Sequence, residues 1–113
     1  MLAPSMDQRI LVVDDDPDLV DVAAEMIGRR HEVVGTTSTV RALELITAGG
    51  IWLLVTDIRM PGVNGFQLIE QARSIAPRLA VVIVSAYYDE AEPLARDVCG
   101  RYADQALSKP LTM

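Results

Sequence analysis

The sequence predicts an α/β domain built on a doubly wound, parallel sheet of five strands. Short apolar runs rich in β-branched residues alternate along the chain with longer segments whose apolar residues recur at helical spacing. The runs are apolar at consecutive positions rather than at every second one, which is typical of strands buried on both faces of a parallel sheet. Strands joined by helices in this way are connected by right-handed crossovers.

The element boundaries follow from local signals. Asp16 is a good N-cap and Pro17 a good first-turn residue for the first helix. Gly49-Gly50 should end the second helix, and the Gly- and Pro-containing segment 60–65 should form a loop. The predicted strands are 10–13, 32–35, 52–56, 79–84 and 105–108, and the predicted helices are 17–30, 40–46, 66–72 and 93–99.

The length, charge and composition of the chain exclude several classes of protein. The 113 residues suit one domain over 1–113, with 1–8 as an N-terminal extension, and a hydrophobic content of 50% argues against disorder. A net charge of −6 weakens any case for direct nucleic-acid binding. We expect no membrane association, because no apolar run approaches the roughly 20 residues of a bilayer span. A single cysteine, Cys99, and the lack of a signal peptide favour the cytoplasm.

Residues with carboxylate, hydroxyl or amine side chains directly follow four of the predicted strands. In an open α/β sheet, ligands bind outside the carboxyl ends of the strands, where the strand order reverses. A strand order of 2-1-3-4-5 puts this reversal between the first and third strands, so these residues should converge there. They are Asp14 and Asp15 after the first strand, Asp57 after the third, Ser85 after the fourth and Lys109 after the fifth.

Three converging carboxylates repel one another, and a hard divalent cation would relieve the repulsion. Mg²⁺ is the natural choice, with Mn²⁺ as an alternative, because it prefers oxygen ligands and a substrate phosphate. A carboxylate can also act as a nucleophile and form an aspartyl phosphate. Ser85 and Lys109 could then bind two of the phosphoryl oxygens, since phosphoryl transfer needs mainly positioning and charge neutralisation.

Four motifs together resemble the receiver domains of two-component signalling systems, which have a flavodoxin-like fold. They are Val12–Asp16, Asp57–Gly65, Val84–Ala86 and Lys109-Pro110, in the family's order and over essentially the whole chain. The resemblance implies that Asp57 accepts a phosphoryl group from a phosphohistidine of a sensor kinase or a phosphotransfer protein. It also implies that Asp15 binds Mg²⁺ directly and that Asp14 acts through water.

The resemblance assigns further roles. The backbone carbonyl of Arg59 would be a metal ligand, Ser85 the switch hydroxyl, and Lys109 the cation that pairs with the acidic site or the phosphate. Such a domain is a signalling module and not an enzyme acting on a separate substrate. Arg59 and Tyr87 occupy variable positions that tune the lifetime of the phosphoryl group in the family.

The chain departs from the family at its output surface. Ala106 stands where an aromatic residue usually reports phosphorylation, and the chain ends before a fifth helix. We expect intact input chemistry and an altered readout, with Tyr87 or Tyr88 filling the space beside Ala106. An apolar sheet face left without its helix should favour a homodimer or a partner helix.

Several alternatives remain open from the sequence. A pseudo-receiver that binds partners without phosphorylation would keep the fold, and fold alone does not exclude a phosphohydrolase or a flavin protein. Ser85 and Lys109 could be ordinary strand-end and surface residues. Cys99 and Trp52 are expected to pack, and His31 is expected to favour a helix C-terminus.

Overall fold

A computed structural model describes residues 9–57, 65–85 and 105–108. Eight elements follow one another in the predicted α/β order. They are β1 (Arg9–Val13), α1 (Pro17–Gly28), β2 (Glu32–Thr36), α2 (Thr39–Ala48), β3 (Ile51–Thr56), α3 (Gly65–Ile75), β4 (Ala80–Ser85) and β5 (Gln105–Ser108).

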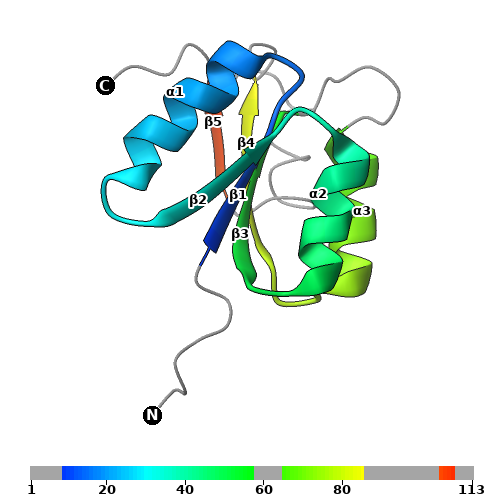
Figure 1. Ribbon diagram of the computed structural model, residues 1–113. Helices are drawn as coiled ribbons and strands as arrows, with labels where there is room; N and C mark the ends of the chain where they lie inside the picture. The colour runs from blue at the N-terminus through cyan, green and yellow to red at the C-terminus, as the bar shows by residue number, and fades with distance from the viewer. Residues whose placement is uncertain (1–8, 58–64, 86–104, 109–113) are drawn as a thin grey trace.

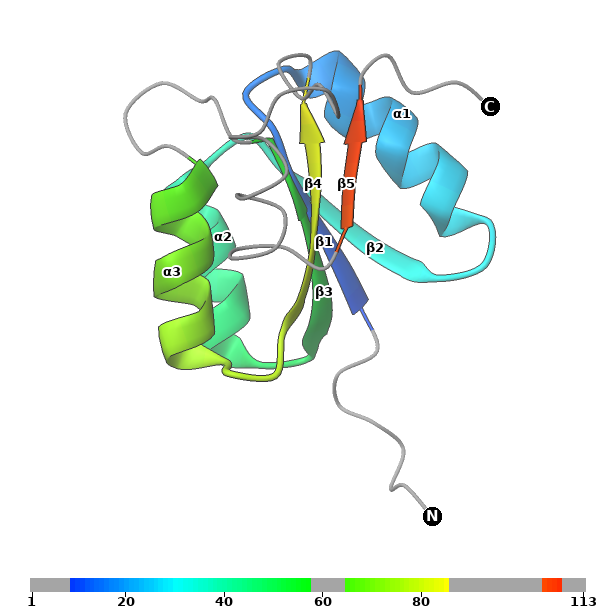
Figure 2. The ribbon, with the colours of Figure 1, turned by 180° about the vertical axis from the view of Figure 1, so that it is seen from behind.

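The five strands form one parallel sheet in the order β2-β1-β3-β4-β5, which confirms the predicted topology. The sheet is the middle layer of the molecule: α1 lies on one face, and α2 and α3 lie together on the other (Figures 1 and 2). Because the chain crosses from β2 over β1 to reach β3, the strand order reverses at β1 and β3. This reversal lies where the sequence predicted a ligand site.

The sheet has an apolar core on each face. The core under α2 and α3 is the larger, and it holds the fully buried Leu11 and Leu54 on the central strands and Leu68 on α3. The core under α1 contains Val20 and Ala23 of that helix. All four apolar residues of β1, Ile10 to Val13, are at most 3% exposed, as expected of a strand covered on both faces.

The helix ends follow the predicted signals closely. The Asp16 carboxylate accepts a hydrogen bond from the Asp18 N–H, which makes Asp16 the N-cap of α1. The helix α1 ends at Gly28 rather than near Arg30. In the turn that follows, the N–H groups of Arg30 and His31 both donate to the Ile27 carbonyl. At the end of α2, Gly49 has a φ of 89°, a left-handed value that favours glycine.

Three local predictions need adjustment. Gly65 was expected in a loop but is the first residue of α3. Leu79 precedes β4 rather than opening it, because its N–H donates to the Ala76 carbonyl in the turn after α3. Trp52 does not pack fully: it is 39% exposed, with its ring 6.4 Å from that of His31.

The predicted helix 93–99, with Cys99, lies outside the described residues. Among the helices that the structure does describe, we find none with the length and apolarity of a membrane span.

The contact between α1 and β2 depends on a residue without a side chain. A Cβ placed on Gly35 would overlap Cγ1 of Val20, whereas one placed on Gly28 would meet no atom within 4 Å. Val20 is β-branched and buried, so it has little freedom to move aside. Gly35→Ala should therefore lower the free energy of unfolding by about 1–3 kcal/mol.

Gly28→Ala provides the matched control in urea unfolding. It makes the same chemical change in open space, and it should be neutral or stabilise by up to about 1 kcal/mol. Equal losses in the two variants would contradict the packing argument.

Candidate functional site

Two aspartates lie side by side because the strands that precede them are paired. Val13 of β1 is in register with Thr56 of β3, and Asp14 and Asp57 are the next residues on each strand. The Asp57 N–H donates to the Val13 carbonyl at 3.3 Å, and the Asp14 N–H donates to the Thr36 carbonyl at 3.3 Å. The ladder thus extends into both aspartates and fixes their backbones at the carboxyl edge of the sheet.

The carboxylates of Asp14, Asp15 and Asp57 form a cluster. One oxygen from each lies within 4.8 Å of the others. Asp14 and Asp57 are 1% and 5% exposed, whereas Asp15 is exposed to solvent. At an effective dielectric of about 20, two full negative charges at this separation repel by roughly 3 kcal/mol. A bound cation would relieve repulsion of this kind.

Local hydrogen bonds fold the loop between β1 and α1 around this cluster. One carboxylate oxygen of Asp14, Oδ1, accepts a bond of 2.9 Å from the Asp16 N–H, and Oδ2 is also shielded from solvent. Asp16 in turn caps α1. Asp14 is thus held in one orientation by its own loop. Asp15, which lies between Asp14 and Asp16 in the sequence, remains accessible from solvent.

A buried hydroxyl helps to fix Asp57. Thr56 is 1% exposed, and its Oγ1 donates to the Asp57 carbonyl at 2.9 Å. The backbone N–H and the backbone carbonyl of Asp57 therefore both have hydrogen-bond partners, the Val13 carbonyl and the Thr56 hydroxyl. Thr56 had no predicted role, although a hydroxyl residue directly before the aspartate that ends a strand was a visible signal.

The remaining predicted site residues are placed only in part. Ser85 is the last residue of β4, in register with Ser108 of β5, and both strands end at the same edge of the sheet as β3 (Figure 2). The backbone of Ser85 is therefore at the predicted edge. Lys109 directly follows Ser108 but lies outside the described residues, as do Arg59, Tyr87 and Tyr88.

The donor set fits a hard divalent cation. Three carboxylates supply oxygen atoms only, which suits Mg²⁺ or Mn²⁺ better than ions that prefer nitrogen or sulfur ligands. The backbones of Asp14 and Asp57 are anchored by hydrogen bonds to neighbouring strands, and Asp15 is open to solvent, so a cation could be held while keeping some of its water.

A comparison with protein families decides what kind of domain carries this site. The family described as the response regulator receiver domain matches residues 10–113. The chain belongs to this family. Relatives of the receiver domain include the transcriptional regulatory protein YrkP of Bacillus subtilis, which is 33% identical over 110 residues, or 95% of this chain and 45% of YrkP. The response regulator FleR of Pseudomonas aeruginosa is 31% identical over 73% of this chain and 18% of its own length.

Solved structures agree with the fold of the receiver domain. A receiver domain protein from Clostridium thermocellum superposes with a TM-score of 0.80 at 26% identity, covering 93% of this chain and 84% of that one. The response regulator TrrA of Thermotoga maritima, solved in complex with Mg²⁺ and BeF, gives a TM-score of 0.77 at 25% identity, covering 93% and 89%. The chain spans less than half the length of YrkP and about a fifth of FleR.

Proposed function

We propose that this receiver domain accepts a phosphoryl group on Asp57 from a phosphohistidine of a sensor kinase or a phosphotransfer protein. The observation that carries the proposal is the buried Asp57 carboxylate, held at the carboxyl end of β3 within 4.8 Å of two further carboxylates. A carboxylate oxygen of Asp57 would bond to phosphorus as the phosphorus–nitrogen bond of the phosphohistidine breaks. The departing imidazole nitrogen then takes up a proton, and Asp57 becomes an acyl phosphate.

Mg²⁺ is the proposed cofactor, with Mn²⁺ as an alternative. Asp14, Asp15 and Asp57 would hold it, together with the backbone carbonyl of Arg59. When bound, the cation would neutralise charge on the phosphoryl oxygens. Asp14 would keep its orientation through the Asp16 N–H, and Thr56 would hold the backbone at Asp57. Ser85 and Lys109 are proposed to bind the other phosphoryl oxygens.

The proposed output is the control of another domain or partner from the cytoplasm, in line with the transcriptional regulators among the relatives. The backbone at Ala106 pairs with Ile83 of β4, two residues before Ser85. An alanine at this position removes the aromatic ring that usually reports phosphorylation in the family. The readout should therefore depend on other groups, while the input chemistry is retained.

Intact mass after incubation with acetyl phosphate tests the proposal. We expect a single phosphoryl adduct that forms in the presence of Mg²⁺. The adduct should not form when EDTA is present from the start, because the three carboxylates then repel the incoming phosphate. Mn²⁺ should restore the adduct. Folding is checked in the same samples by circular dichroism.

An absent adduct in a folded, Mg²⁺-bound sample would refute phosphotransfer and would favour a pseudo-receiver. The convergence of the three carboxylates favours phosphotransfer, since a module that only binds partners would not need three oxygen donors gathered at one point.

A further inference from the structure

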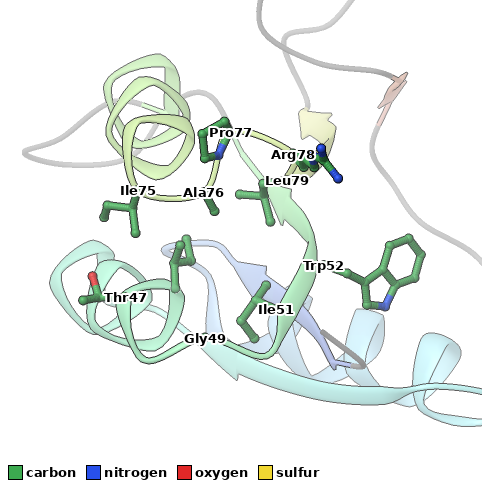
Figure 3. A pocket seen from close by; sticks show the side chains of 10 residues that line it. Thr47, Gly49, Ile51, Trp52, Ile75, Ala76, Pro77, Arg78 and Leu79 are labelled. Atoms are coloured by element: carbon green, nitrogen blue, oxygen red, sulfur yellow. The ribbon is translucent and has the colours of Figure 1, made fainter. Parts of the chain in front are cut away.

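The receiver domain has a pocket at the edge of the sheet opposite the carboxylates. It is a pocket of about 490 Å³ between the ends of α2 and α3 and the beginnings of β3 and β4 (Figure 3). Ile46, Ile51 and Leu79 line it and are at most 5% exposed. This volume is within the range of pockets that bind ligands, and it is large enough for one or two apolar side chains.

Exposed apolar side chains gather around this pocket. Among the described residues, four large hydrophobic side chains are notably exposed, and two of them line the pocket: Trp52 at 39% and Ile75 at 45%. The other two, Val22 and Val40, lie on α1 and at the start of α2. Surface that is concave and apolar together is characteristic of a binding site rather than of scattered exposure.

The charge around the pocket is opposite to that of the chain. Arg78 is the charged residue that lines it, on a protein whose net charge is −6. The His31 ring lies 6.4 Å from that of Trp52, directly after Arg29 and Arg30 in the sequence. Arg9 is in register with Ile51, although the acidic Glu32 stands opposite Arg9 on β2. Among the charged side chains that the structure describes at this edge, the balance is basic, whereas Asp14, Asp15 and Asp57 make the other edge acidic.

We propose that this pocket, which we call the α2–α3 pocket, binds an acidic peptide segment of a partner protein. An apolar side chain of the peptide would enter between Ile51, Ile75 and Leu79, and a neighbouring carboxylate would meet Arg78. A peptide fits better than a free small acid, because the binding features continue from Trp52, at the border of the pocket, to the neighbouring His31 ring. The surface is separate from the phosphotransfer site and does not depend on its chemistry.

The fluorescence of Trp52 provides the readout, because Trp52 borders the pocket and is the only tryptophan in the sequence. The probe is the acetylated and amidated hexapeptide Glu-Asp-Leu-Leu-Asp-Glu, titrated into the 113-residue chain. We expect a saturable change in Trp52 fluorescence that weakens as salt is added. A hexapeptide with lysine in place of each acidic residue should give no saturable change.

Two matched pairs of variants test the charged contact and the apolar contact of the proposed site. Arg78→Glu should weaken binding of the acidic hexapeptide by about tenfold or more, since a charge is reversed beside it. Arg41→Glu is the control: it makes the same change on the exposed first turn of α2, at the far end of that helix from the pocket. Ile75→Ser should likewise reduce binding, whereas Val40→Ser should leave it unchanged. All four positions are exposed, so the fold is expected to tolerate the changes.

Amide shifts measured by NMR should cluster around residues 46–52 and 75–79. The proposal is overturned if the acidic hexapeptide gives no saturable change, or if the lysine hexapeptide binds equally well. It is also overturned if Arg78→Glu and Arg41→Glu affect binding to the same extent, or if the amide shifts fall elsewhere.

Discussion

Asp57→Asn should abolish the phosphoryl adduct and, in the absence of metal, stabilise the protein. The amide of asparagine is a poor nucleophile, so no acyl phosphate can form at this position. The substitution also removes one of three charges whose oxygens lie within 4.8 Å of one another. Relief of that repulsion should raise the free energy of unfolding by about 1–2 kcal/mol in EDTA, after screening at the exposed Asp15. Intact mass and urea unfolding measure the two effects on the same sample.

Asp21→Asn is the matched control for this experiment. Asp21 is exposed on α1 and is not a member of the carboxylate cluster. Its replacement should leave the adduct intact and change stability by no more than about 0.5 kcal/mol. An adduct that persists in Asp57→Asn would assign the chemistry to another residue. A loss of stability in that variant would show that Asp57 is held mainly by favourable contacts rather than by opposing charges.

The convergence of the acidic residues was predictable from sequence because it follows from topology. Asp14 and Asp57 are far apart in the chain, but each directly follows an apolar run, and parallel strands present their carboxyl ends at one edge. The strand order was confirmed. The capping of α1 by Asp16 was also confirmed, because it depends on a short-range pattern that the fold does not override.

Differences among neighbouring residues were not predictable in the same way. Nothing in the Asp-Asp-Asp run distinguishes the buried Asp14 from the exposed Asp15 and Asp16, because this depends on where β1 stops pairing with β2. The exposure of Trp52 has a similar origin. A β-bulge shifts the pairing of β1 with β3 between Arg9 and Ile10, opposite the residues that flank Trp52, so simple alternation does not hold there.

The α2–α3 pocket illustrates a further limit. It is built from the ends of two helices and the starts of two strands, which are brought together only by the packing of α2 against α3. No motif marks it, and Arg78 alone looks like an ordinary turn cation. The expectations for Arg59, Lys109, Tyr87 and Cys99, and that of a homodimer, remain predictions.

The two faces of the sheet should contribute unequally to stability, and adjacent leucines of β3 can measure the difference. Leu54 is 0% exposed in the larger core under α2 and α3, whereas Leu53 is only partly buried beside the core under α1. Leu54→Ala should lower the free energy of unfolding by about 3–5 kcal/mol, because it leaves a cavity that the rigid central strand cannot close.

Leu53→Ala makes the identical change one residue earlier, so the loss of strand propensity is nearly the same in both variants. It should cost about 1–2 kcal/mol, since its side chain already contacts solvent. Urea unfolding of the two variants gives the difference, which isolates burial from backbone effects. Equal losses would mean that the core under α1 is packed as tightly around Leu53 as the opposite core is around Leu54.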